Sequence, residues 1–131
     1  MKKMLLLIFL ICLIPLGCGP QIRVMQYDSV VRAPNLGRID VYHSLSEVNR
    51  NYRIIADIKI KNTRIHKQDC REETKNMLIS NAEKMGGDGV VINPFEQRSQ
   101  TVSDGMGSKI TEKFILGTAN VIVYEEKLSQ K

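Results

Sequence analysis

The amino-acid sequence predicts a small α+β domain: a mixed β-sheet in ββαββ order with one main helix packed on one face. Apolar residues alternate with charged residues over 53–61, which is typical of a strand with one buried face. Over residues 70–85 apolar residues recur every three or four positions, which indicates an amphipathic helix. A short apolar run at 90–92 then predicts an immediate return into the sheet.

The first seventeen residues have the order of a bacterial lipoprotein signal peptide. Lys2 and Lys3 precede an apolar run, 4–16, that is shorter than the roughly 20 residues of a membrane-spanning helix. Gly17 supplies a small residue before Cys18, so we expect cleavage between them and a palmitate-containing lipid on the Cys18 thiol. An uncleaved N-terminal anchor and an ordinary secretory signal are the alternatives.

The elements before the helix are predicted in turn. Residues 18–36 read as the lipidated N-terminus and a tether, in which a short strand is the alternative. Residues 37–125 form the domain, and an alternating pattern predicts its first strand at 39–43. Over 53–61 the alternation places Ile54, Ala56, Ile58 and Ile60 on the buried face and Ile55 among the charged residues of the wet face.

The helix has signals at both ends. Asp69 is the expected N-cap and Glu72 has the spacing of a capping box. Gly86 and Gly87 stop the helix, because glycine readily takes the left-handed conformation. The predicted apolar stripe consists of Thr74, Met77, Leu78, Ala82 and Met85.

After the helix we expect a buried strand at 90–92, with Pro94 at an edge or bulge because it cannot donate a ladder hydrogen bond. Residues 97–108 read as a loop. Within it, 103–107 favours a mobile hairpin loop over a phosphate loop, because no Lys-Ser/Thr ending or helix follows. Residues 110–124 form one long strand bent at Gly117, or two strands, and 126–131 are a polar tail.

Charge and cysteine content limit the functional classes. The net charge of +5 includes two lysines of the signal peptide, and the other basic residues are scattered without an aromatic set, so no nucleic-acid partner is predicted. Cys12 lies in the signal and Cys18 takes the lipid, which leaves Cys70 without an internal disulfide partner. Cys70 is then buried, bonded to another chain, or free, and burial is the favoured reading.

His66, Asp69 and Cys70 are the only candidate metal ligands that the sequence brings together. A structural metal site normally needs four ligands, and His43 is the only other histidine, so a loop and cap are favoured over a metal site. Cys70 at a helix N-terminus could act as a nucleophile with a lowered pKa, but no third orienting group is identifiable. We therefore predict a non-enzymatic protein without a cofactor.

Four stretches of the sequence give the chain a family resemblance. Residues 41–42, 52–60, 81–91 and 116–119 together resemble the RcsF-like and YbjQ-like family of envelope lipoproteins, which is sometimes labelled heavy-metal-binding. Physically, the glycines of these stretches permit a sharp turn, close packing or a bend, and Asp88 is expected to bond local backbone amides while Gly89 is small where helix and strand meet. The motif residues are Gly86, Gly87, Asp88, Gly89, Gly117 and Thr118.

The resemblance implies a lipid-anchored envelope protein that acts through protein–protein contacts in envelope structure, assembly or stress sensing. The family's disulfide-braced mechanism does not transfer, because residues 93–95 and 113–115 lack the cysteines found there. A self-associating, ring-forming module is the alternative, with a metal or ligand carrier as a third class. Gly19, rather than Asp, follows Cys18, which by analogy predicts the outer membrane, facing the periplasm.

Overall fold

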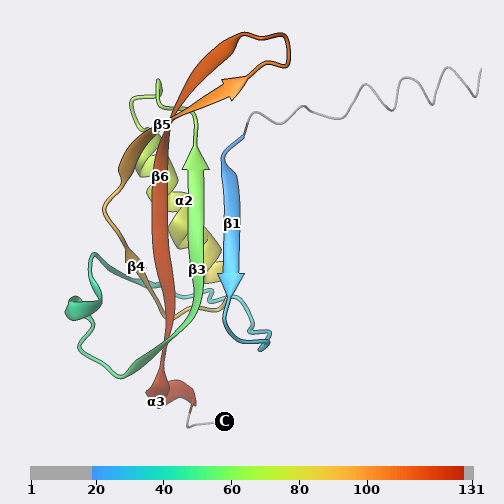
Figure 1. Ribbon diagram of the computed structural model, residues 1–131. Helices are drawn as coiled ribbons and strands as arrows, with labels where there is room; N and C mark the ends of the chain where they lie inside the picture. Colours follow the sequence, from blue (N-terminus) through green and yellow to red (C-terminus); the bar gives the residue numbers. More distant parts are fainter. Residues whose placement is uncertain (1–18, 129–131) are drawn as a thin grey trace, which may run out of the picture.

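The computed structural model describes residues 19–128, so the predicted signal peptide and Cys18 lie outside the described residues. One helix packs on one face of a six-stranded mixed sheet, which confirms the predicted α+β class (Figure 1). The strand order is β1-β3-β6-β4-β2, with β5 paired to β6. The elements are β1 (Gln21–Gln26), β2 (Asp40–Tyr42), η1 (Leu45–Glu47), β3 (Tyr52–Asn62), α2 (Cys70–Lys84), β4 (Gly89–Ile92), β5 (Glu96–Ser103), β6 (Lys109–Tyr124) and α3 (Glu125–Leu128).

Strand β6 is the centre of the sheet, and it is one continuous strand rather than two. It pairs with β3 along one side and with β4 and then β5 along the other, always antiparallel. The pairing with β3 ends at Asn62 and Ile115, so β5 and the first part of β6 continue as a two-stranded ribbon beyond the end of β3 (Figure 1). Strand β2 adds to β4 in parallel, which makes the sheet mixed.

The main core lies between α2 and the sheet. Along the helix, the predicted stripe is confirmed, because Thr74, Leu78 and Ala82 are buried and two methionines pack against them. The glycine stop is also confirmed: Gly86 has a φ of 75°. Its backbone N–H and that of Gly87 donate to the carbonyls of Glu83 and Ala82, which is the hydrogen-bond pattern of a Schellman C-cap.

The predicted faces of β3 are wrong at its first half. The register shifts between Ile54 and Ala56, so that a β-bulge lies at Ile55. As a result Ile55 turns into the core beside Ala56, while Ile54 packs against a smaller cluster that contains Ile122 and Tyr124. A bulge inserts one extra residue and reverses the alternation beyond it, which a strict period of two cannot anticipate.

One motif interpretation also needs correction. Asp69 occupies the N-cap of α2 but makes no side-chain capping bond, so the predicted capping box with Glu72 is wrong; its ψ of 19° is not extended. The Asp88 carboxylate accepts a hydrogen bond from the Tyr124 backbone N–H at 2.9 Å, which ties the turn after α2 to the end of β6. The atoms nearest to a Cβ added at Gly89 belong to Ile122 and Tyr42, so side chains of two neighbouring strands lie against this glycine.

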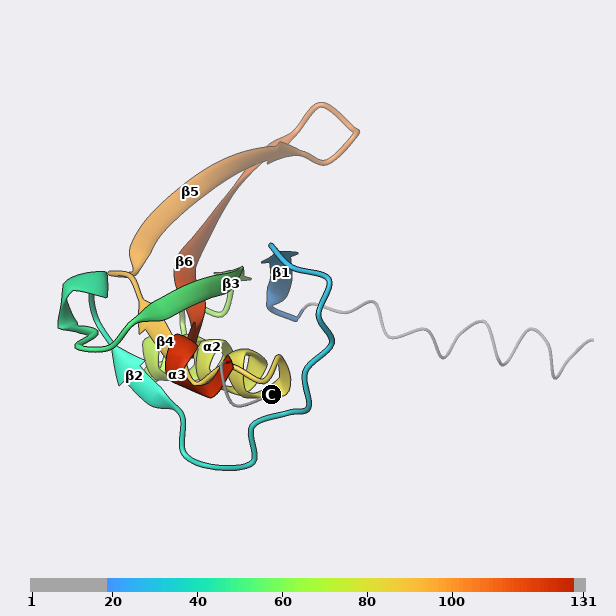
Figure 2. The ribbon, with the colours of Figure 1, turned by 90° about the horizontal axis from the view of Figure 1, so that it is seen from below.

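Three segments have more structure than expected. Within 18–36, residues 21–26 form edge strand β1, and the chain after it is tied to the end of α2 by the Asn35 N–H, which donates to the Glu83 carbonyl at 2.8 Å (Figure 2). The predicted loop at 97–108 is wrong, because β5 extends to Ser103 and only 104–108 form the hairpin turn. The polar tail begins as α3, and β4 ends at Ile92, before Pro94.

Candidate functional site

The face of the sheet opposite α2 carries a row of polar side chains from four neighbouring segments. Arg23 of β1 lies opposite Lys59 of β3 in the strand register, and Lys59 lies opposite Thr118 of β6. Asn93 follows the end of β4 and bonds Thr118 twice: its backbone N–H donates to the Thr118 carbonyl at 3.0 Å, and its Nδ2 donates to Oγ1 at 3.1 Å. We call Arg23, Lys59, Thr118 and Asn93 the polar row.

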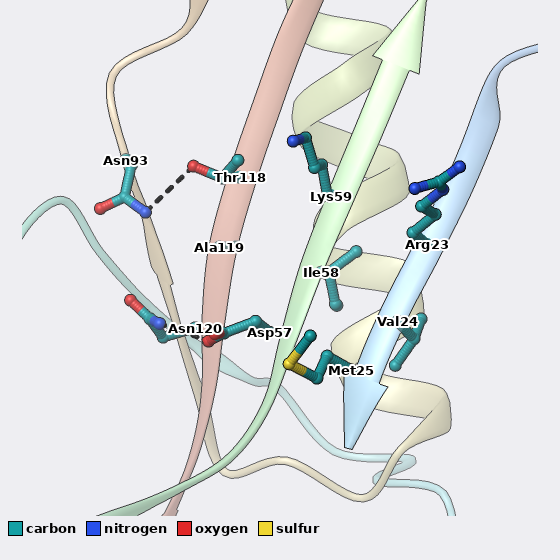
Figure 3. Close-up of a pocket in the computed structure, with 10 residues that line it drawn as sticks. All are labelled: Arg23, Val24, Met25, Asp57, Ile58, Lys59, Asn93, Thr118, Ala119 and Asn120. Carbon is teal, nitrogen blue, oxygen red and sulfur yellow. Dashed lines mark hydrogen bonds between the residues drawn. The ribbon is translucent and has the colours of Figure 1, made fainter. Parts of the chain in front are cut away.

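A cleft of about 630 Å³ lies along this row (Figure 3). Figure 3 shows that its side chains come from β1, β3, β6 and the segment after β4. The lining residues are Arg23, Val24, Met25, Asp57, Ile58, Lys59, Asn93, Thr118, Ala119 and Asn120.

The one carboxylate of the cleft is held by neighbouring side chains. The Tyr27 hydroxyl donates to Asp57 Oδ2, and Asn120 Nδ2 donates to Asp57 Oδ1. The hydrogen bond to this carboxylate raises the pKa of the Tyr27 phenol, so the phenol keeps its proton and remains a donor. Both oxygens of Asp57 therefore already accept hydrogen bonds within the protein.

Whereas the Asp57 carboxylate is held by neighbouring side chains, the two cations of the polar row are not held by an oppositely charged side chain within the described chain. Of the ion pairs formed within residues 19–128, none involves Arg23 or Lys59. Arg23 and Lys59 are register partners, and like charges directly opposite each other in a ladder lower the stability of the sheet. The cleft therefore presents a positive wall with hydroxyl and amide groups beside it, which is suited to an anionic or strongly polar binding partner.

An aromatic cluster lies on the same face of the sheet, at the end of β6 that is away from the ribbon of β5 and β6. The Tyr124 hydroxyl donates to Asp40 and lies 2.8 Å from the Tyr42 hydroxyl. Burial, and secondarily the hydrogen bond to Asp40, raises the pKa of Tyr124, so this phenol stays protonated. The Arg50 guanidinium stacks over the Tyr124 ring at 4.8 Å. This cluster fixes β2 and β6 to each other beside the cleft.

The residues predicted as weak metal ligands are not brought together. His66 and Asp69 are exposed, whereas Cys70 is only 3% exposed and free of a disulfide, which confirms the favoured reading of that cysteine. No group of three or more His, Cys, Asp or Glu is placed to hold a metal within the described chain. Burial raises the pKa of the Cys70 thiol, the opposite of what a helix N-terminal nucleophile needs.

The residues of the cleft were not recognised from the sequence. The alternating pattern of β3 places residues 57, 59 and 61 on its solvent-exposed face. In β6, Thr118 and Asn120 alternate with apolar residues in the same way. Arg23 gave no such signal, because its segment read as a tether.

Comparisons with protein-family models, with curated proteins and with solved structures find no match to this chain. Among the helices within residues 19–128, none is both long and apolar enough to cross a membrane.

Proposed function

We propose that this chain is a lipid-anchored, non-enzymatic protein of the bacterial cell envelope that acts by binding other envelope proteins. The observation that carries the proposal is the cleft on the open face of the sheet, with Arg23 and Lys59 as an unpaired positive wall. The signal-like residues before Cys18, and the resemblance to RcsF-like and YbjQ-like lipoproteins, support the envelope location. The role would lie in envelope structure, assembly or stress sensing.

The chemistry of the cleft favours a partner segment that carries a carboxylate. A guanidinium and an ammonium group attract the charge over a distance, and the Thr118 hydroxyl can donate a hydrogen bond at short range. Charged groups of this kind set specificity and association rate more than raw affinity. An acidic segment of a protein that faces the periplasm is therefore the expected partner.

The partner is tested by photocrosslinking in intact cells. A photoreactive amino acid replaces Thr118 inside the cleft, and a control protein carries it at Glu72, an exposed position of α2 on the other side of the sheet. We expect a discrete crosslinked product from position 118 only. Crosslinks that are equal from both positions, or absent from position 118, would contradict the proposed surface.

A charge reversal tests the role of the positive wall. Lys59→Glu should strongly reduce the crosslinked product formed from position 118, because it replaces attraction by repulsion. Lys67→Glu, at an exposed position outside the cleft, is the matched control and should leave the product unchanged.

The lipid anchor is tested separately by labelling cells with a radioactive fatty acid. The native protein should take up the label and Cys18→Ser should not. Label that enters both proteins equally would exclude Cys18 as the acylated residue.

Self-association is a second candidate function, and the free edge of β5 favours it. Within the described chain β5 pairs with β6 alone, and all eight of its residues are exposed. Such an edge is a template for strand addition from a second copy. Light scattering on the purified protein decides the matter: a ring or dimer of uniform mass supports this function, and a monomer opposes it.

A further inference from the structure

The spacing between Cys18 and the sheet is very short. Only Gly19 and Pro20 separate Cys18 from Gln21, the first residue of β1. At about 3.5 Å per residue, the Cα atoms of Cys18 and Gln21 are at most about 10 Å apart. If Cys18 carries a lipid, as the proposed function states, the start of β1 lies close to the membrane surface.

The ribbon is at the same end of the sheet as the start of β1. Strand β1 runs antiparallel to β3, so Gln21 pairs with Lys61 near the end of β3. The ribbon, which comprises residues 97–114, leaves the sheet where that strand ends, and Figure 1 shows it projecting past the start of β1. At about 3.4 Å per residue, the six residues 109–114 extend roughly 20 Å beyond the last pair of β3.

The ribbon therefore extends farther from the sheet than the link between Cys18 and Gln21 can span. If a lipid on Cys18 holds the domain with its strands roughly perpendicular to the membrane, the ribbon tip lies at or below the level of the headgroups. The bilayer that holds the anchor is consequently the nearest partner of the ribbon tip.

The tip has the side chains that such a contact requires. Val102 and Ile110 are register partners and thus share one face of the ribbon. They are 44% and 60% exposed, and Met106 in the turn is 91% exposed. Lys109 follows the turn and supplies a cation that can meet lipid phosphate groups. Apolar side chains with a neighbouring cation are typical of elements that lie at the membrane interface.

The turn holds Met106 in place at the tip. Asp104 Oδ1 accepts hydrogen bonds from the backbone N–H groups of Met106 and Ser108, at 2.8 and 3.1 Å. The Asp104 N–H donates in turn to the Ser108 carbonyl at 3.1 Å, which closes the hairpin. The polar backbone groups of the turn are thereby partly satisfied inside the protein, which lowers the cost of placing it among lipids.

We propose that Val102, Met106 and Ile110 form a second membrane contact, which inserts into the interfacial zone of the bilayer that holds the lipid on Cys18. This contact rests on the anchor of the proposed function, but it is a separate surface from the cleft. With the anchor it holds the domain at two points and fixes its tilt.

The test uses the complete lipidated protein in vesicles of phosphatidylethanolamine and phosphatidylglycerol. An environment-sensitive fluorophore is attached to Met106→Cys, or to the control Asn49→Cys. Asn49 is exposed and lies between η1 and the start of β3, which is the end of that strand away from the ribbon. Lipids that carry a spin-label quencher are then included. We expect the label at position 106 to shift to the blue and to lose most of its fluorescence, and the label at position 49 to do neither.

A variant separates the apolar contact from simple proximity. Val102→Thr combined with Ile110→Thr changes only exposed positions, and it should restore much of the fluorescence of the label at position 106. The inference is overturned if labels 106 and 49 are quenched equally, or if neither is quenched, while the protein floats with the vesicles. A protein that does not float would instead refute the anchor, and with it the proposed function.

Discussion

Gly117 sets the distance between α2 and the centre of the sheet. A Cβ atom at this position would lie 2.7 Å from Thr74 Cγ2, with Phe95 and Leu78 also in contact. Thr74 cannot easily move, because its hydroxyl donates to the Cys70 carbonyl at 2.8 Å and accepts from Asn62 Nδ2 at 3.1 Å. The close-packing role predicted for this glycine is thus confirmed.

Gly117→Ala should therefore destabilise the protein. We expect the free energy of unfolding to fall by about 1–3 kcal/mol, because the added methyl group overfills a closed core. Urea denaturation measures the change. Gly19→Ala, where nothing lies within 4 Å of the added Cβ, is the control and should leave the midpoint unchanged. Equal midpoints for both variants would show that the helix can move away without cost.

Cys70 illustrates how burial decides the chemistry of a single side chain. Its thiol is buried under the first turn of α2, and burial raises its pKa, so that little thiolate forms at neutral pH. In the folded protein we expect Cys70 to resist Ellman's reagent, and in urea we expect it to react stoichiometrically. Rapid reaction of the folded protein would contradict the buried placement.

At the scale of the elements, the segment between β1 and β2 is an ordered strap, not a tether. Asp28 forms ion pairs with Arg32 at 2.6 Å and with Arg53 of β3 at 3.5 Å. The hydrogen bond from Arg32 lowers the pKa of the Asp28 carboxyl from 3.8 to about 2. The strap is thereby tied to the sheet by a carboxylate that stays charged in mild acid.

The strap predicts a pH dependence. Since the folded state has the lower pKa, the contribution of Asp28 is fully present above 3.8 and is lost as the pH falls through about 2. Asp28→Asn should therefore lower stability at neutral pH and flatten the decline across this acid window. Urea midpoints of both proteins over that window measure the effect. Parallel curves would mean that the ion pairs contribute nothing.

The elements also show what sequence periodicity can predict. Both ends of helix α2 are predictable from the sequence. The apolar stripe, the residues at its start and the glycine stop at Gly86 all indicate the same boundaries. Strand β5 was missed because both of its faces are exposed, so no apolar alternation marks it. The bulge at Ile55 was missed because it depends on pairing with β6, which is not a local property of the chain.

At the scale of the whole molecule, the ribbon contributes little to the stability of the domain. Its residues in β5 are all exposed. Lys61 of β3 contacts the ribbon by an ion pair with Glu112 at 3.0 Å, a hydrogen bond to Gln100 at 3.3 Å and a cation–π contact with the Phe114 ring at 4.6 Å. Surface ion pairs contribute only about 0–1 kcal/mol. The ribbon is therefore an appendage built on a core that does not need it.

Shortening the ribbon tests this independence. Replacing residues 100–112 by Asn-Gly joins Ser99 and Lys113, which are register partners, through a tight hairpin turn. We expect the fold to persist, with the free energy of unfolding changed by no more than about 1 kcal/mol. Circular dichroism and urea denaturation measure this. Loss of the folded transition would show that the ribbon supports the core.

The candidate cleft was beyond sequence reasoning for a related reason. Its polar row joins residues that are as far apart in the chain as Arg23 and Thr118, and only the strand order β1-β3-β6-β4 makes them neighbours. The wet side chains of β3 were predictable one strand at a time. Their assembly into one surface depends on tertiary pairing.

The attachment of β1 has a mechanical consequence. A pull between a membrane anchor at Cys18 and a partner on the sheet would run along the strand axes, from the first residue of β1. The ladder of β1 and β3, from Gln21 and Lys61 to Gln26 and Ala56, would then be loaded in shear, with its hydrogen bonds sharing the force. A force that peeled β1 away from β3 would instead break these hydrogen bonds one at a time. A domain anchored in this way would bear tension while its sheet stays intact.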